Sequence, residues 1–461
     1  MASPEIIERC VRLISCRSLT HEGNRAAAEL CARELLGPAG IEARLIPSIN
    51  EGGLQVNLLA IVHGRDHSLA PIVLNTHLDT VPPGDHKLWT ECGGDPFAAR
   101  IDGDRIYGLG AADTKLDFVA KAAALIAVQR PKRDVYLIGT FGEEHGLAGA
   151  KEIAAGKLLP RGAMAFVGEP SGLEIITAHK GLGAFDFDLR FEPVQLNSPI
   201  PMKKAIFIGR SAHSSTPHLG ANAIRAAIDA IANHREAAVA SFSGGDAVNK
   251  VPARCELTVS HELSAKLRRA AAIEQLEYPS NKLIPPRVVE RLAEFIRRLS
   301  EFADSAGSIE DDYAAPTLTC NPGIIHSDDD TLSLKFEMRP PPSMSFDTVR
   351  AGLDGIVADL SREPDGIGIT LRQGRANPGF RSPASSATVE LAIQSLAAAG
   401  LPVKTGVKSG CTEAGIYASI GLIPIVFGPG PWAGVIHAPN EYNLLSQVEG
   451  AIRFYQEALV R

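Results

Sequence analysis

The chain has 461 residues, more than a single hydrophobic core usually organises, so two domains are expected. With 45% hydrophobic and 21% charged residues, its composition is that of a soluble globular protein. The formal net charge is -7 and no basic block is present, which argues against nucleic acid or an anionic membrane surface as a partner.

The N-terminal segment and the cysteines indicate a cytoplasmic protein. Glu5 and Glu8 stand where a signal peptide has a basic start and an unbroken apolar core, and no later stretch reaches about 20 apolar residues. The seven cysteines are scattered and lack the CxxC spacing of a thiolate metal site. We expect reduced thiols, most of them buried for structural reasons.

In residues 1–180, segments with the apolar periodicity of helices alternate with short runs rich in β-branched residues. This is the pattern of an α/β sheet. Catalytic residues in such sheets follow the strand ends, so the polar motifs after three of these runs are candidates for a site. The predicted strands are 41–48, 57–64, 71–79, 134–142 and 163–170.

Between about 181 and 374 the pattern changes to that of an α+β insert. Within it, the segment 262–316 is rich in charge and contains an amphipathic helix at 288–303. The predicted strands of the insert are 184–191, 204–209, 254–260 and 331–338, and its other predicted helices are 221–233 and 346–360.

The α/β pattern returns after Pro378, with a helix at 386–399, a strand at 424–429 and a closing helix at 446–459. The simplest architecture is a discontinuous catalytic metal-binding domain, residues 1–181 and 378–461. It is interrupted by a lid-like domain, residues 182–377, that carries the extra segment near 262–316.

The first candidate metal ligand is His77, with Asp79 two residues further on. Residues two apart in an extended strand point to the same side, so both side chains can share one environment. A carboxylate beside a ligating histidine orients the ring. Because this spacing is common, a purely structural pair is the alternative.

The second candidate is Asp113, after the glycine-rich turn 107–112 and at the start of a predicted helix. One carboxylate there can bridge two cations. A dinucleotide-binding loop is the competing interpretation, but the turn lacks a third small residue and a complete βαβ frame with an acidic ribose ligand.

Glu143 and Glu144 follow a predicted strand, and adjacent carboxylates repel unless positive charge compensates them. A metal ion would supply that charge, so that one glutamate ligates and the other acts as a base; a solvated acidic turn is the alternative. With Glu169 and His437, these donors resemble a histidine and carboxylate site for a bridged metal pair.

The motifs resemble those of the zinc amidohydrolase family that contains acetylornithine deacetylase, succinyl-diaminopimelate desuccinylase, aminoacylases and glutamate carboxypeptidases. The resemblance covers nearly the whole chain. Its landmarks are NTHLDTVPPG at 75–84, DPFAARIDGDRIYGLGAADTK at 95–115, GTFGEEHGLAGA at 139–150, GEPSGLEIITAHKG at 168–181, GRSAHSSTPHLGANAI at 209–224 and HAPNEY at 437–442.

The resemblance implies two divalent metal ions, zinc being favoured over cobalt or manganese. It also implies Glu143 as the general base and Asp79 as the partner that orients His77. The implied ligands are Asp113 as the bridge, His77 and Glu169 on one ion, and Glu144 and His437 on the other.

For the insert, the resemblance implies a ferredoxin-like lid and dimerisation domain. His213 would stabilise the developing oxyanion, often across a homodimer, while Asn249 and Arg339 would bind substrate. The chain departs from the family pattern at Leu116–Asp117, where small glycines are usual, and in the inserted segment 262–316.

The expected activity is hydrolysis of the amide bond of an N-acyl amino acid. GEPSGLEIITAHKG and the segment 411–414 look closest to acetylornithine deacetylase. A two-zinc dipeptidase or carboxypeptidase acting on a dipeptide-like substrate is one alternative, since the metal motifs are shared. A catalytically silent, metal-dependent binding protein is an alternative of another class.

Overall fold

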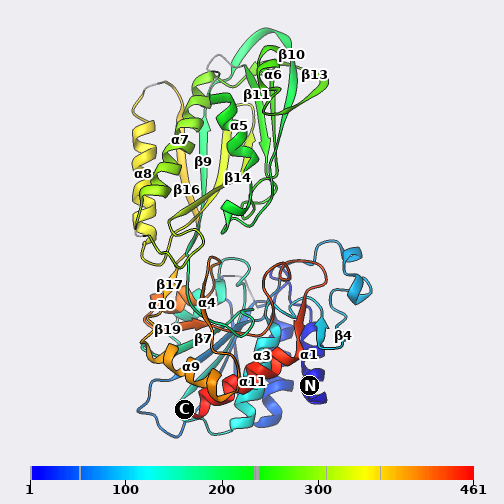
Figure 1. Cartoon of the computed structure of the whole chain (residues 1–461), viewed down its shortest axis with the longest axis vertical. Coiled ribbons are helices and arrows are strands. Elements are labelled where there is room, and N and C mark those ends of the chain that lie inside the picture. The colour runs from blue at the N-terminus through cyan, green and yellow to red at the C-terminus, as the bar shows by residue number, and fades with distance from the viewer. Residues whose placement is uncertain (1–2, 51–52, 233, 235–237, 308, 364) are drawn as a thin grey trace. The chain divides into compact units, whose positions relative to one another are not determined.

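The computed structural model describes residues 3–50, 53–232, 234, 238–307, 309–363 and 365–461. The chain divides into two compact units (Figure 1). Unit 1 comprises Met1–His179 and Phe380–Arg461, and unit 2 comprises Lys180–Gly379. The boundaries expected from the sequence lie within two residues of these, and the roles given to the two domains stay predictions.

Unit 1 is built on a nine-stranded sheet in the order β1-β2-β6-β3-β7-β19-β8-β17, with β18 paired to β8. The central strand β3 is parallel to β6 and β7, and β19 is parallel to β7, so the carboxyl ends of these four strands lie at one edge. The strands are β1 (Ala43–Pro47), β2 (Val56–Val62), β3 (Ile72–His77), β6 (Val135–Thr140), β7 (Met164–Gly168), β8 (Ile175–His179), β17 (Phe380–Arg381), β18 (Thr405–Lys408) and β19 (Ile423–Val426).

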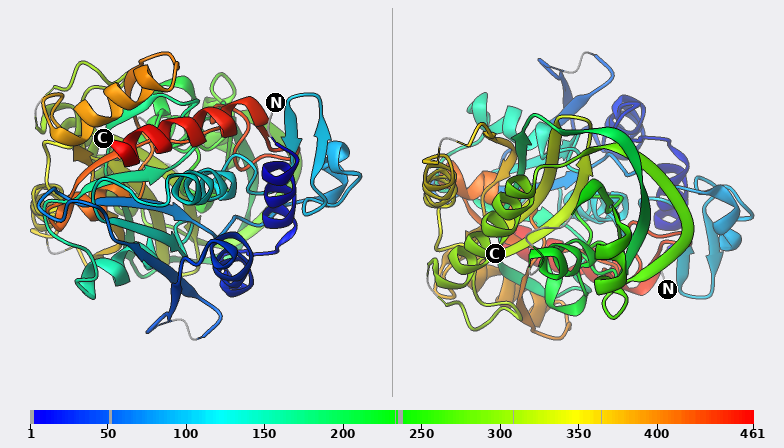
Figure 2. Two further views of the ribbon diagram at one scale, coloured as in Figure 1. Left: turned by 90° about the horizontal axis from the view of Figure 1, so that it is seen from below. Right: turned by 90° about the horizontal axis from the view of Figure 1, so that it is seen from above.

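Helices cover both faces of this sheet, because alternate residues of the buried strands point to opposite sides. Leu74 of β3 packs into one core with α3 and α11, whereas its neighbour Val73 packs into a second core with α4 and α10. Figure 2 (left) shows α11, in red, beside α3, in cyan. The helices are α1 (Pro4–Ser15), α2 (Arg25–Leu30), α3 (Lys115–Val128), α4 (Ala148–Ala155), α9 (Ala387–Ala398), α10 (Ala414–Ser419) and α11 (Leu445–Val460).

A small three-stranded sheet brings together two distant parts of unit 1. It consists of β4 (Arg100–Asp102), β5 (Arg105–Tyr107) and β20 (Tyr442–Leu444), and Tyr442 pairs with Tyr107. The sequence did not predict these short strands. Their pairing places the turn that leads to Asp113 beside the segment that follows His437.

Unit 2 is an eight-stranded sheet in the order β13-β10-β12-β11-β14-β15-β9-β16, over which α5, α7 and α8 pack (Figure 1). On α7, the buried Leu292, Phe295 and Leu299 recur at helical spacing, and the ring of Phe295 stacks on that of Phe187 with centroids 3.7 Å apart. The elements are β9 (Leu182–Arg190), β10 (Val194–Ile208), α5 (Ala223–Ala232), β11 (Val239–Gly244), β12 (Arg254–Ser260), α6 (His261–Leu267), β13 (Ala272–Leu283), α7 (Pro286–Ser305), β14 (Thr319–Ser327), β15 (Thr331–Arg339), α8 (Phe346–Leu360) and β16 (Gly368–Asn377).

The predicted α/β class with an inserted α+β unit is confirmed. The insert is wider than one ferredoxin-like unit, because the segment 262–316 contributes α6, β13 and α7, and β13 joins the sheet edge beside β10. Residue 233, the predicted end of the helix at 221–233, lies outside the described residues. Every helix in the described part of the chain is too short or too polar to cross a lipid bilayer.

Candidate metal centre

The predicted ligands from the parallel strands come together at the carboxyl edge of the unit 1 sheet. His77 is the last residue of β3, Glu169 follows β7 directly, and Glu143 and Glu144 lie in the turn after β6. One donor atom each from His77, Glu143 and Glu169 lie within 4.8 Å of one another. The same holds for His77, Asp113 and Glu144.

Asp113 lies between two histidines. One carboxylate oxygen is 3.2 Å from Nε2 of His77, and the other is 3.2 Å from Nε2 of His437. Oε1 of Glu169 is 3.9 Å from the first ring nitrogen, and Oε1 of Glu144 is 3.0 Å from the second. The contacts thus form two sets that share the Asp113 carboxylate.

Asp79 fixes the turn that carries the two glutamates. Its carboxylate accepts hydrogen bonds from the backbone N–H groups of Glu143, at 3.1 Å, and Glu144, at 3.4 Å, and from Oγ1 of Thr20, at 2.8 Å. Nδ1 of His77 lies 3.0 Å from the backbone oxygen of Asp79 and 3.6 Å from its carboxylate. Asp79 therefore orients both the histidine and the glutamate turn.

The cluster contains more carboxylates than positively charged groups that could balance them. Burial raises the pKa of Glu143, Glu144 and Glu169, that of Glu169 to about 8, and neighbouring carboxylates add to the rise. Burial also opposes ionisation of Asp113, but hydrogen bonds from His437 and His77 hold its pKa well below the usual range. Neighbouring acids with such different environments are typical of functional sites.

Both histidines hold protons strongly in this arrangement. Burial would lower the pKa of His437, but its hydrogen bonds to Asp113 and Glu144 raise it to about 12. For His77, burial is likewise outweighed by the hydrogen bonds to Asp113 and Asp79, and the pKa rises well above its usual value. Divalent cations would replace these protons as the source of positive charge, and nitrogen and carboxylate donors suit zinc and related ions. The donor set fits a dinuclear centre.

Two further buried acids belong to the centre, and the sequence reasoning did not assign them. Oε1 of Glu441 accepts the backbone N–H groups of Ala112, at 2.8 Å, and Asp113, at 3.0 Å, and so fixes the bridging position. Glu413 accepts a hydrogen bond of 2.8 Å from Oγ1 of Thr140, and burial raises its pKa to about 7. Both residues lie in segments that resemble the family, HAPNEY at 437–442 and the segment 411–414, and this resemblance was the signal that could have identified them.

The residues predicted in the insert come together within unit 2. The backbone N–H of Ser214, next to His213, donates to the backbone oxygen of Asn249 at 3.0 Å. Nη2 of Arg339 donates to Oγ of Ser214 at 3.1 Å and to Oε2 of Glu337 at 2.9 Å. The three residues are close in space although the segment 262–316 separates Asn249 from Arg339 in the chain.

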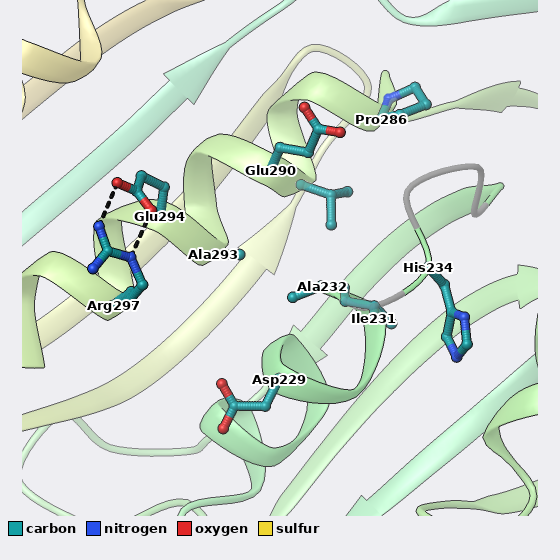
Figure 3. A pocket seen from close by; sticks show the side chains of 10 residues that line it. Asp229, Ile231, Ala232, His234, Pro286, Glu290, Ala293, Glu294 and Arg297 are labelled. Atoms are coloured by element: carbon teal, nitrogen blue, oxygen red, sulfur yellow. Dashed lines mark hydrogen bonds and ion pairs between the residues drawn. The ribbon is translucent and has the colours of Figure 1, made fainter.

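Two other features contain none of the predicted site residues. Figure 3 shows a pocket between α5 and α7, rimmed by Asp229, Glu290 and the Glu294–Arg297 ion pair. His63 and His67 lie with Asp134 before the amino end of β6, where both histidines are exposed. The cluster at the strand ends has the stronger case for catalytic chemistry, because His77, Asp113 and Glu169 are buried and their charges are shielded from water.

Two comparisons of the sequence with known proteins agree on its family. The sequence model of peptidase family M20/M25/M40 matches residues 73–461. The chain is 30% identical over 348 residues to acetylornithine deacetylase of Klebsiella pneumoniae (strain 342), covering 64% of this chain and 82% of that protein.

Solved structures share the fold along almost the whole chain. An aminoacylhistidine dipeptidase from Vibrio alginolyticus has a TM-score of 0.70 at 17% identity, covering 99% of this chain and 96% of the other. A dinuclear metal-binding peptidase of the M20 family from Bacillus subtilis has a TM-score of 0.55 at 13% identity, again covering 99% and 96%. At these identities the likeness concerns the fold.

We predict that Zn²⁺ binding to the metal-free protein releases protons. Coordination requires neutral imidazoles and ionised carboxylates, whereas the raised pKa values of His437, about 12, and Glu169, about 8, keep both groups protonated at pH 7. Titration calorimetry should give a binding heat that depends on the ionisation enthalpy of the buffer. Because protons compete with the metal, the affinity should fall as the pH is lowered from about 8 to about 6.

The control for this experiment is His326→Ala in unit 2, at an exposed pair with Asp328, which should leave the proton release unchanged. His437→Ala should reduce it. A binding heat that is the same in every buffer would contradict the proposed protonation of the metal-free site.

Proposed function

The chain belongs to peptidase family M20/M25/M40, and we propose that it is a dinuclear metal-dependent deacylase of N-acyl amino acids. It is a hydrolase of linear amide bonds. The observation that carries the proposal is the Asp113 carboxylate held between His77 and His437, with Glu143 beside the same cluster. The 30% identity to an acetylornithine deacetylase favours a deacylase.

In this proposal His77, Asp113 and Glu169 would hold one ion, and Asp113, Glu144 and His437 would hold the other. We propose zinc, since imidazole and carboxylate donors without thiolate suit it, with cobalt and manganese as alternatives. When bound, such ions polarise the amide carbonyl and make water more acidic.

Glu143 acts as the general base. Burial raises its pKa, so the carboxylate accepts a proton from water more readily than an exposed glutamate does. Its position is set by the hydrogen bond from its backbone N–H to Asp79. The same carboxyl then returns the proton to the amine nitrogen of the departing amino acid.

The substrate's carboxylate binds to Arg339, and His213 donates a hydrogen bond to the oxygen that becomes negative. Arg339 is 3% exposed, and its Nη2 is fixed by Ser214 and Glu337, which limits the orientations of its planar group. Because Ser214 adjoins His213, both substrate-binding groups belong to one region of unit 2. Homodimer assembly and a cytoplasmic location stay predictions.

A dipeptidase is the second candidate, favoured by the match of residues 73–461 to the model of a peptidase family. It would use the same metal ligands and the same base. The two candidates differ in whether the acyl side of the scissile amide carries a free amino group.

The first test is amine release by the zinc-loaded protein from a matched panel of substrates. The panel pairs N-acetyl, N-succinyl and N-formyl amino acids, including N-acetylornithine, with dipeptides that have the same C-terminal residue. We expect release from N-acyl amino acids that is lost after EDTA treatment and restored by Zn²⁺. Cleavage of dipeptides alone would establish the second candidate, and no cleavage of either class would reject both.

Glu143→Gln should lower kcat by at least about 10²-fold, the lower range for loss of a general acid–base group, because the amide cannot accept the proton. The amide keeps the size of the side chain, so metal content should stay that of the original protein. Glu152→Gln is the matched control, since Glu152 accepts hydrogen bonds from Ser48 and Asn50 away from the metal cluster. Near-normal turnover by a metal-replete Glu143→Gln protein would remove Glu143 from this role.

Arg339→Lys should raise KM by about tenfold or more, because lysine keeps the charge but loses the forked pair of donors that matches a carboxylate. For a substrate whose carboxylate is replaced by a carboxamide, Arg339→Lys and the original protein should have the same KM. Arg372→Lys serves as the control, since the exposed Arg372 forms an ion pair with the half-buried Asp188 in the same unit. Equal sensitivity of both substrates would show that Arg339 acts on the structure of unit 2 instead.

A further inference from the structure

A fully buried ion pair lies on α3, one helical turn beyond Asp113. The carboxylate of Asp117 is 2.6 Å from Nζ of Lys121, and neither side chain is exposed. Replacing a buried ion pair by uncharged residues of similar shape is often neutral for stability, because removing two charges from water costs as much as their attraction returns. The position of the pair is therefore more informative than its contribution to stability.

Lys121 ties the helix to the end of the central strand. Its Nζ donates to the backbone oxygen of Asn75 and, at 3.1 Å, to Oγ1 of Thr76, both in β3. Burial lowers the pKa of Lys121, and the charges of Asp117, Glu413 and Glu169 oppose that lowering. The ammonium group thus interacts both with its partner and with carboxylates of the metal centre.

Asp117 ties the same helix to two further elements. Its carboxylate accepts hydrogen bonds from Oγ1 of Thr76, at 2.6 Å, and from the hydroxyl of Tyr455 on α11, at 2.7 Å. It also fills a space beside β7, since a Cβ atom added to Gly168 would lie 2.0 Å from Oδ2 of Asp117. Gly168 therefore cannot be replaced by a larger residue while Asp117 keeps this position.

Each of these contacts adjoins a proposed metal ligand. Thr76 immediately precedes His77, Gly168 immediately precedes Glu169, and Asp113 lies four residues before Asp117. We propose that the Asp117–Lys121 pair is a positioning device that sets the distances among His77, Asp113 and Glu169. This inference rests on the proposed metal centre and concerns its affinity for metal, whatever the substrate. Asp117 lies at the place where the sequence departs from the family's small glycines.

The test is the double substitution Asp117→Asn with Lys121→Met, which removes both charges and nearly preserves the shapes. We expect the metal-free protein to fold and the affinity for Zn²⁺, measured by competition with a chromophoric chelator, to fall by about 10- to 100-fold, as for groups that orient metal ligands. The matched control is Arg291→Met with Asp365→Asn, which removes a largely buried ion pair of 2.8 Å in unit 2. The control should keep the original Zn²⁺ affinity.

If the double variant does not fold, Tyr455→Phe provides the milder test, because it removes one hydrogen bond to Asp117 and should lower the affinity severalfold. Zn²⁺ affinity within twofold of the original in a folded variant would overturn the positioning role. Normal metal binding by the original protein together with no cleavage of the substrate panel would reject the deacylase and leave the positioning role standing. The two proposals can therefore fail separately.

Discussion

The Asp113 carboxylate, with one oxygen 3.2 Å from Nε2 of His77 and the other 3.2 Å from Nε2 of His437, is the contact around which unit 1 is arranged. Three glutamates share this buried space, and their pKa values rise because burial and like charge disfavour ionisation. When metal is lacking, protons on the histidines and on Glu169 reduce the excess of negative charge. Two divalent cations would satisfy it with the same donors, so one constraint on charge accounts for the composition of the site and for its affinity for metal.

Meeting this constraint requires parts of the chain that are far apart in sequence. Parallel pairing of β3, β6 and β7 brings three loops to one edge of the sheet, as such sheets do. Pairing of β5 with β20 joins the turn before Asp113 to the segment after His437, and Glu441 then fixes the backbone of Asp113. The ion pair on α3 connects the start of that helix to the strand ends below it.

The sequence was sufficient for β3, β6 and β7 and for the placing of candidate ligands after them, because β-branched runs and motif residues at strand ends are local signals. It was insufficient where a role depends on a contact between distant segments. Asp117 was visible only as a departure from a pattern, since its partners Thr76 and Tyr455 are 41 and 338 residues away. The strand β13 was also missed, because its segment is rich in charge, which does not indicate a strand. It is a strand because it pairs with β10, a contact that composition does not reveal.

The placement of the inserted segment 262–316 explains how unit 2 accommodates it. Its strand β13 joins the outer edge of the sheet and α7 packs on the helical face, so β11 and β14 still pair directly and Asn249 stays near Arg339. The loop that follows α7 in the chain, however, contacts Lys180, whose Nζ donates to the backbone oxygens of Ala315 and Thr317. Burial lowers the pKa of Lys180 to about 8, Glu310 opposes this, and the charge of Arg339 contributes to the lowering. The insertion thus leaves the pairing of β11 with β14 and of β14 with β15 intact, and it contacts the strands through Lys180, whose charge interacts with that of Arg339.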